Sequence, residues 1–389
     1  MLVKYLTNIK YTNYPKVKLI YSEKEVNKFL NEDEYKKLIL CKNKIDDIKN
    51  TKDWDKAKKL CNDYELIYTP NKNNKSNSIS IYEPISRSYF KLWEIITYFK
   101  LLDNNQKLRC AGIAEGPGGF IECIVNYRNK YFSIKDDIYA ITLIDDNKDI
   151  PSWKKSYKFL RNNNINICYG LDGTGNIYNV DNIKTFSEFV EDKIDFITAD
   201  GGFDFSKNFN NQERLSTRII FCEIVTALSI QKEGGTFICK LFDSYNDITI
   251  QYINLLNFLY EEIILVKPDT SRPANSEKYI ICRGFKGIDQ NYLKKLYIIV
   301  KSWENINNNN YIIKNIFDEI IDKELLKDIV DFNTTTFNLQ KNNISKTLNI
   351  INESQNLKKL NNIIKYQTQK AIDWCNRYNI NVNYNSVFI

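Results

Sequence analysis

The sequence contains no histidine among its 389 residues. This absence excludes Ser-His-Asp and Cys-His nucleophilic catalysis, zinc sites with histidine ligands, and any imidazole acid or base. Any chemistry that this protein performs must therefore depend on Lys, Asp, Glu or Tyr side chains or on backbone groups.

The chain also lacks the patterns that mark secreted and membrane proteins. None of its nine cysteines belongs to a C-x-x-C pair, which predicts reduced, buried thiols and not a zinc site or a disulfide framework. No run of about 18 uninterrupted apolar residues occurs, and the charged N-terminus does not have the pattern of a signal peptide. We therefore expect a soluble, intracellular protein without a membrane segment or a bound metal.

The excess of positive charge is modest for a chain of this length. Lys and Arg number 55 against 48 Asp and Glu, a formal net charge of +7. This balance suits a polyanionic partner and favours a local basic groove over a uniformly basic surface. Charge alone, however, fits an ordinary solvated surface equally well.

Three regions differ in their sequence pattern. Residues 1–80 alternate short extended pieces, such as Val17–Tyr21, with charged helical patterns and end in a polar stretch at 71–80 that predicts a loop. Residues 81–287 alternate short apolar runs with helical segments. Residues 288–389 contain long amphipathic patterns, which predict a mainly helical C-terminal region. We expect a central domain at 81–287, preceded by an N-terminal accessory region.

The central region has the pattern of a parallel α/β sheet. Seven apolar runs predict strands, and each of the first five is followed by a loop rich in Gly, Asp or Asn and then by helix-compatible sequence. The runs are 108–113, 138–143, 165–169, 194–199, 235–240, 262–266 and 277–283.

A glycine-rich turn follows the first of these strands. Three glycines within four residues let the backbone turn sharply and let a ligand approach main-chain atoms that a Cβ would block. The turn matches neither G-x-x-x-x-G-K-[ST] nor a full G-x-G-x-x-G, so it favours an adenosine-containing cofactor over a triphosphate, although a simple strand-to-helix turn explains it equally well. The candidate cofactor-binding residues are Ala114, Glu115, Gly116, Pro117, Gly118, Gly119 and Phe120.

Two acidic residues at later strand ends could serve the same pocket. Asp145 or Asp146 follows the second strand, where a carboxylate can accept hydrogen bonds from a ribose. Asp172 follows the third strand, where it could accept a hydrogen bond from an adenine amino group. Each of them singly is as well explained as a turn former.

Five motifs follow one another in the central region: SRSYFKLWEI (86–95), AGIAEGPGGF (111–120), DFITADGGFDF (195–205), GGTFICKLFD (234–243) and KPDTSRPANSEKYIIC (267–282). In this order they resemble the motifs of FtsJ-like, S-adenosylmethionine-dependent RNA 2'-O-methyltransferases. Cap methyltransferases of the Adrift type and their relatives in large DNA viruses look most similar. The resemblance covers roughly residues 82–285 and implies a Rossmann-like methyltransferase sheet with helices on both faces.

The resemblance also implies a catalytic Lys-Asp-Lys-Glu tetrad, whose members fall on Lys91, Asp200, Lys240 and Glu277. In a protein without histidine, a lysine with a lowered pKa is the expected general base, because partial burial and a second lysine favour the neutral amine. We assign this role to Lys240, with Lys91 as the neighbouring like charge. Asp200 and Glu277 would orient the two amines, and Asp200 would also lie near the methyl donor, S-adenosyl-L-methionine.

RNA has to reach the same edge of the sheet. The candidates for phosphate contacts and stacking are Arg87, Tyr89, Trp93, Arg272 and Asn275, although Tyr and Trp more often pack in a core. The resemblance implies the 5' end of capped mRNA as substrate, a capping enzyme as a partner, and the host cytoplasm or the virion as the location if the protein is viral. The alternatives are a 2'-O-methyltransferase of rRNA or tRNA and a catalytically silent RNA-binding subunit of a capping complex.

Overall fold

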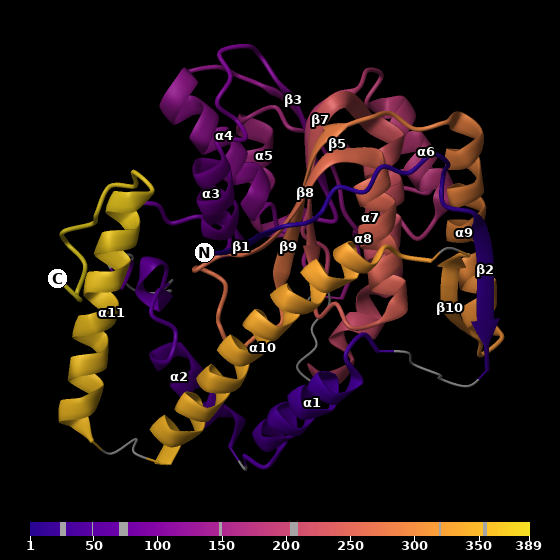
Figure 1. Cartoon of the computed structure of the whole chain (residues 1–389). Helices are drawn as coiled ribbons and strands as arrows, with labels where there is room; N and C mark the ends of the chain where they lie inside the picture. Colours follow the sequence, from indigo (N-terminus) through magenta and orange to yellow (C-terminus); the bar gives the residue numbers. More distant parts are fainter. Residues whose placement is uncertain are drawn as a thin grey trace.

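The computed structural model places the central region in one mixed sheet with helices on both faces (Figure 1). The sheet has eight strands in the order β1-β8-β9-β7-β6-β3-β4-β5, which confirms the predicted α/β class. The structure describes residues 1–23, 29–48, 50–69, 77–147, 150–202, 209–318, 320–352 and 356–389. Most of the polar stretch predicted as a loop at 71–80, and the end of the DFITADGGFDF motif, lie outside the described residues.

Five parallel strands form one part of the sheet, and a helix follows each of them. Their apolar runs are nearly continuous because both faces of a parallel sheet are covered. The chain moves outward from β3 to β4 and β5, and then returns to place β6 on the other side of β3. Ligands bind at such a switch point, outside the carboxyl ends of the strands. The five strands are β3 (Arg109–Ile113), β4 (Asp137–Ile141), β5 (Asn166–Cys168), β6 (Ile194–Ala199) and β7 (Gln231–Leu241).

Three strands extend the sheet beyond β7. β9 (Lys278–Phe285) lies antiparallel between β7 and β8 (Tyr260–Lys267), and β1 (Leu2–Tyr5) pairs with the outer edge of β8. The register sets Tyr279 opposite Lys240, so the start of β9 meets the carboxyl end of β7. Glu277, which directly precedes β9, is thereby brought to the switch-point edge.

Two apolar layers hold the helices on the sheet. Successive strand residues point to opposite layers, as Cys110 and Ala111 do in β3. One layer packs against α3 (Ser88–Phe99), α4 (Gly119–Phe132) and α5 (Tyr157–Asn162). The other packs against α6 (Val180–Phe189), α7 (Gln212–Ile230), α8 (Asp247–Leu259) and α9 (Gln290–Asn308), on the right of the sheet in Figure 1.

Both flanking regions pack against the central domain. Besides β1 at the sheet edge, Trp374 of α11 is fully buried in the same layer as Phe90 of α3. Helix α10 crosses the front of the molecule in Figure 1, and both α1 and α2 pack against it. The domain boundaries near residues 80 and 287 stay predictions. The flanking elements are α1 (Glu32–Asp46), α2 (Thr51–Leu60), η1 (Glu65–Ile67), α10 (Lys323–Asn352), α11 (Leu357–Arg377) and a two-stranded sheet of β2 (Val17–Ser22) and β10 (Ile312–Phe317).

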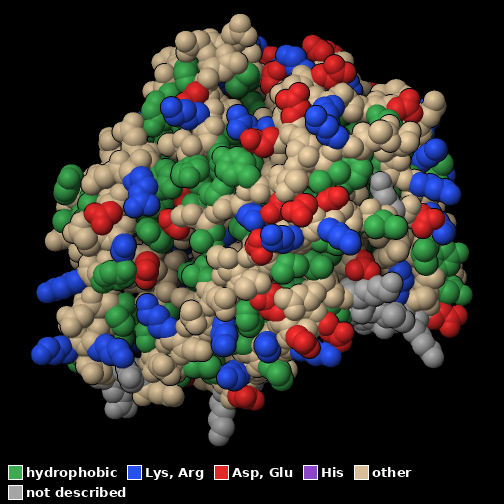
Figure 2. All heavy atoms as spheres, in the orientation of Figure 1, with side chains coloured by type: hydrophobic (Ala, Val, Ile, Leu, Met, Phe, Trp, Pro, Cys, Tyr) green, Lys and Arg blue, Asp and Glu red, His purple; other side chains and the backbone are tan. Residues whose placement is uncertain are grey.

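All seven strands predicted for the central region form, within a few residues of the predicted bounds, and all nine cysteines are free and buried. The strands β1 and β10 were not predicted. On the face drawn in Figure 2, Lys and Arg side chains are interspersed with Asp and Glu side chains, so this face is not uniformly basic. Within the described ranges, no helix is both long and apolar enough to cross a membrane, and no group of three or more Cys, Asp or Glu side chains is placed to hold a metal ion.

Candidate active site

A cavity of about 890 Å³ opens at the carboxyl ends of the parallel strands. Its size is typical of a site for a small molecule. The loops that follow β3, β4, β5 and β6 contribute to its wall, together with the end of β7 and the segment before β9. The lining residues include Ala114, Gly116, Pro117, Thr142, Leu143, Asn147, Gly175, Tyr178, Asp200, Gly201, Gln212, Lys240, Asn275 and Glu277.

Lys240 and Asp200 form an ion pair in the wall of this cavity. The Nζ atom of Lys240 lies 3.2 Å from Oδ1 of Asp200 and donates a hydrogen bond of 2.7 Å to the Asp200 backbone carbonyl. The hydroxyl of Tyr279 donates to the same Oδ1 at 3.1 Å. The Asp200 carboxylate is therefore held by two residues that face each other across β7 and β9.

Lys91 and Glu277 form a second ion pair. The Lys91 Nζ lies 2.7 and 2.8 Å from the two carboxylate oxygens of Glu277, and Ser271 Oγ donates to one of them at 3.0 Å. Burial alone would raise the pKa of Glu277, but the charges of Lys91 and Lys240 outweigh it and lower this pKa to about 2. All four residues assigned to the tetrad thus meet at one edge of the sheet, in two lysine–carboxylate pairs.

The electrostatics of Lys240 differ from the prediction. Burial lowers its pKa, as expected, but the negative charges of Asp200 and Glu277 outweigh burial, and the pKa is raised. The prediction of a lowered pKa, caused by Lys91 and burial, is therefore wrong: burial acts in the expected direction, but the carboxylates outweigh it. Three carboxyl groups surround this ammonium group, and Lys91 is already paired with one of them.

Two further carboxyl groups are buried beside the Lys240–Asp200 pair. Glu223 of α7 accepts a hydrogen bond of 2.7 Å from the backbone N–H of Gly201, and its burial raises its pKa to about 8. Burial also raises the pKa of Glu115 well above its ordinary value. At neutral pH Glu223 is therefore largely protonated, and the two ion pairs with the lysines are formed by Asp200 and Glu277.

The glycine-rich turn contributes to the cavity through part of its length. Ala114, Gly116 and Pro117 line the cavity. The Glu115 carboxylate instead lies over Gly112, where an added Cβ would approach its Oε2 to 2.8 Å. The last three candidates support the wall from behind: Gly118 and Gly119 begin α4, and the Phe120 side chain is 1% exposed in the core.

The two acidic candidates at later strand ends turn toward their own loops. Asp145 accepts a hydrogen bond of 2.7 Å from the backbone N–H of Asn147. Asp172 accepts hydrogen bonds from Thr174, Asn179 and Asn182, which lower its pKa. Both therefore act as turn formers here, while their neighbours in the chain line the cavity.

The candidate RNA-binding residues divide into three groups. Tyr89 and Trp93 are fully buried in the core and stack on each other, so the expectation that they offer a surface to RNA is corrected. Arg87 donates to the backbone carbonyls of four residues, and Arg272 forms two hydrogen bonds with Glu65, so both guanidinium groups are engaged within the protein. Asn275 alone of the five lines the cavity.

Sequence reasoning missed several residues of the site. Tyr279 follows Glu277 by two positions, and the period of a strand would have placed both on one face. Lys267 is buried and donates to the backbone carbonyls of Asn275 and Glu277 at 2.9 and 2.7 Å. No local pattern marks it, because its partners lie across a loop. Glu223 lies in an otherwise apolar stretch of α7, and a charged residue in such a stretch is a pattern that could have indicated a buried functional group.

Comparisons with known proteins show the family of this chain. The family model for FtsJ-like methyltransferases matches residues 84–285, slightly more than half of the chain. This chain belongs to the FtsJ-like methyltransferase family. The predicted resemblance is therefore confirmed, and its limits fall within two residues of those expected.

Curated relatives add detail. Cap-specific mRNA (nucleoside-2'-O-)-methyltransferase 1A of Caenorhabditis briggsae is 30% identical over 345 residues, which cover 81% of this chain and 39% of that protein. Cap-specific mRNA (nucleoside-2'-O-)-methyltransferase 1 of Homo sapiens is 38% identical over 189 residues, or 46% of this chain and 22% of that protein. The matched segment of this chain thus spans less than half the length of either relative.

Among solved structures, human methyltransferase-like protein 13 in complex with SAH covers 56% of this chain and 91% of its own, at 13% identity and a TM-score of 0.33. A methyltransferase from Clostridium acetobutylicum, described as S-adenosylmethionine-dependent, covers 54% of this chain and 79% of its own, at 14% identity and a TM-score of 0.25.

Proposed function

We propose that this chain is a cap-specific mRNA (nucleoside-2'-O-)-methyltransferase that takes its methyl group from S-adenosyl-L-methionine. The observation that carries the proposal is the pair of lysine–carboxylate contacts, Lys240–Asp200 and Lys91–Glu277, at the edge of a cavity in an FtsJ-like domain. The names of the relatives supply the substrate class, capped mRNA.

The cavity suits an adenosine-containing methyl donor. The backbone of Gly116 and Gly175 forms part of its wall, and an added Cβ at Gly175 would approach the Thr142 carbonyl oxygen to 2.1 Å. Side chains of Leu143, Ile177 and Tyr178 provide apolar and aromatic surface for a base, and Asn147 and Asn176 provide amide groups. When bound, S-adenosyl-L-methionine supplies an electrophilic methyl group on a positively charged sulfur.

Lys240 is the proposed general base, and it has to release a proton before it can accept one from a ribose 2'-hydroxyl. Its burial favours the neutral amine, whereas its pairing with Asp200 opposes it. A positive charge beside Asp200 weakens that pairing and lowers the pKa of Lys240. With a cationic donor held in the cavity, Lys240 would be the residue placed to accept the hydroxyl proton.

The other members of the site orient the reactants. The Asp200 carboxylate, fixed by Tyr279, holds the Lys240 amine at the cavity. The Lys91–Glu277 pair is rigid because Ser271 and Lys267 fix the Glu277 side chain and backbone. Such fixed groups speed the reaction chiefly by aligning the hydroxyl with the methyl group. Asn275 and Gln212 line the part of the cavity next to Glu277 and are the proposed contacts to the acceptor nucleotide.

A second candidate function is a catalytically silent member of a capping complex. A relative from Caenorhabditis briggsae named inactive cap-specific mRNA (nucleoside-2'-O-)-methyltransferase 1B is 28% identical over 345 residues, 81% of this chain. The two intact lysine–carboxylate pairs favour an active enzyme. A 2'-O-methyltransferase of rRNA or tRNA would need the same four groups, and the choice between these substrates rests on an assay.

The test supplies labelled S-adenosyl-L-methionine with short RNAs that are identical except for a 5' triphosphate, an unmethylated cap or a methylated guanosine cap. We expect label in the capped RNAs only. Equal labelling of all three RNAs would show that the cap is not recognised, and the substrate would then be another class of RNA. Binding of S-adenosyl-L-methionine and RNA without transfer would establish the silent subunit.

A further inference from the structure

The loop between β8 and β9 carries Glu277 at its end. Contacts from the central domain and from the C-terminal flank hold this loop in place. From the central domain, Glu94 of α3 accepts hydrogen bonds from the backbone N–H groups of Asp269 and Thr270. From the C-terminal flank, Gln340 of α10 donates to the Ala274 carbonyl at 2.9 Å. The loop that positions Glu277 is thus anchored independently of its arginine, Arg272.

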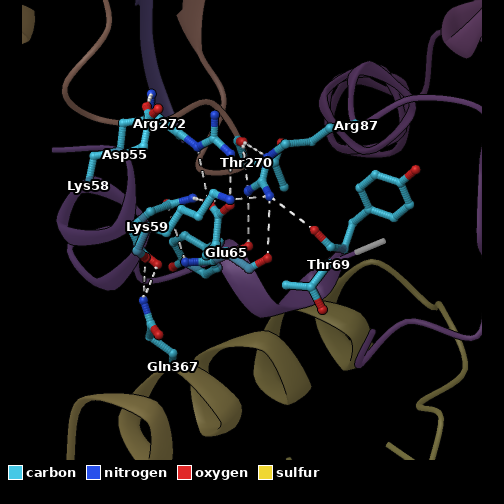
Figure 3. Close-up of polar contacts among 12 residues, drawn as sticks. Asp55, Lys58, Lys59, Glu65, Thr69, Arg87, Thr270, Arg272 and Gln367 are labelled. Atoms are coloured by element: carbon cyan, nitrogen blue, oxygen red, sulfur yellow. Dashed lines mark hydrogen bonds and ion pairs between the residues drawn. The ribbon is translucent and has the colours of Figure 1, made fainter. Parts of the chain in front are cut away.

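Glu65, in the η1 turn of the N-terminal flank, lies between two guanidinium groups (Figure 3). Arg272 Nε and Nη2 donate to its two carboxylate oxygens at 3.1 and 2.7 Å, which is a bidentate pair. Arg87, at the start of α3, places its Nη1 3.5 Å from the same carboxylate. Glu65 is 5% exposed, so this pairing takes place largely away from water.

The η1 turn is itself fixed from the other side. The Gln367 side chain of α11 donates to the backbone carbonyls of Lys59 and Asn62 at 2.8 and 2.7 Å, as the lower part of Figure 3 shows. The Asn62 side chain in turn donates to Glu65 at 2.7 Å. The Glu65 carboxylate therefore has a fixed place, set by both flanking regions of the chain.

Both arginines also lie beside the segment that contacts Glu277: Arg272 directly follows Ser271, whose Oγ donates to Glu277 at 3.0 Å, and Arg87 donates to the carbonyl of Thr270, which precedes Ser271. Arg272 precedes Glu277 by only five residues in the same loop. Arg and carboxylate form bidentate pairs more readily than Lys and carboxylate, because the guanidinium fork matches the carboxylate geometry. Without another anion, Arg272 would compete with Lys91 for Glu277.

We propose that Glu65 is a positioning residue that binds Arg272 and Arg87 and so reserves Glu277 for Lys91. This inference rests on the proposed function only in so far as the Lys91–Glu277 pair serves methyl transfer. It gives the N-terminal region a role: this region supplies the anion that keeps two nearby arginines out of the site.

The test compares Glu65→Gln, Arg272→Gln and the double variant, with Asp318→Asn as a control that removes an exposed ion pair between the flanks, Lys18–Asp318. We expect Glu65→Gln to lower kcat for capped RNA at least tenfold with little change in donor affinity. Arg272→Gln, which removes the competitor, should stay within threefold of wild type, and the double variant should recover to the level of Arg272→Gln.

A purely structural role for Glu65 predicts the opposite pattern, because Arg272→Gln would be as slow as Glu65→Gln and the double variant would not recover. That result would overturn the proposal. If Glu65→Gln does not fold, Glu65→Ala, which also removes the carboxylate, takes its place in the same set.

A crystal structure of the Glu65 variant gives a readout that does not depend on activity. We expect the Arg272 guanidinium within hydrogen-bond distance of the Glu277 carboxylate, and an unchanged Lys91–Glu277 pair would overturn the proposal. If wild-type protein transfers no methyl group, the proposed function fails, and this structure still decides the role of Glu65.

Discussion

The Lys91–Glu277 pair allows a quantitative test of the site by stability alone. The pKa of Glu277 is lowered from its ordinary 4.5 to about 2, which corresponds to about 3 kcal/mol of stabilisation at neutral pH. Both side chains are 13% exposed, so screening by solvent is limited. Removal of either partner leaves the other charge poorly solvated, and breaking such buried pairs typically costs about 3–5 kcal/mol.

We therefore predict that Lys91→Met and Glu277→Gln each destabilise the protein by about 3 kcal/mol. The double variant should be destabilised by clearly less than the sum, with a coupling energy of about 2 kcal/mol or more, because neither charge is then left unpaired. Urea denaturation at pH 7 measures all four free energies of unfolding. A matched cycle on Glu32 and Lys36, an exposed pair in α1, should give less than about 0.5 kcal/mol.

The sign of the pH dependence provides a second check on the same variants. A lowered pKa means that the stabilisation by Glu277 is complete above about pH 4.5 and is lost as the pH falls toward 2. The difference in stability between wild type and Glu277→Gln should therefore shrink in acid. If the effects of Lys91→Met and Glu277→Gln on the free energy of unfolding at pH 7 add to within about 0.5 kcal/mol, the buried Lys91–Glu277 pair as described is refuted.

Three further predictions concern the cavity and its surroundings. Lys240→Ala should reduce methyl transfer by at least about 10²-fold in a single-turnover assay, with S-adenosylhomocysteine affinity in calorimetry nearly unchanged; substantial turnover would remove Lys240 as the base. Gly175→Ala should weaken donor binding at least tenfold, whereas Gly173→Ala, also at positive φ but with nothing within 4 Å of the added Cβ, should not; equal effects would show that strain alone is responsible. The pKa of Glu223 is raised to about 8, so this group favours folding below pH 4.5 and the advantage is lost as the pH rises to 8. Glu223→Gln should therefore gain stability over wild type between pH 5 and pH 8 in urea denaturation. A difference in stability that stays constant with pH would contradict the raised pKa.

The sheet could be predicted from local patterns, whereas the four residues of the tetrad were assigned from the resemblance to the family. Apolar runs that alternate with helices define a parallel sheet, and residues at the ends of its strands converge on one edge. Lys240 and Asp200 end neighbouring strands, so their proximity needs no information beyond strand order.

The parts that could not be predicted depend on contacts between distant segments. Arg87 and Arg272 look like ligands for phosphate until Glu65, 207 residues before Arg272, is seen to bind both. The pKa of Lys240 depends on how many carboxyl groups surround it, and the sequence shows the lysines but not that count. Tyr89 and Trp93 are spaced by four residues on one helix, a pattern that a buried face shares with a stacking surface.

The position of the transferred methyl group shows whether this protein methylates a ribose 2'-oxygen near the cap. Capped RNA is incubated with S-adenosyl-L-methionine and wild-type protein or Lys240→Ala, digested to nucleosides with the cap structure intact, and examined by mass spectrometry. We predict a methyl group on the ribose 2'-oxygen of a nucleotide at or near the cap with wild-type protein and none with Lys240→Ala. A methyl group on a base, or at internal positions whatever the 5' end, would contradict the proposed function.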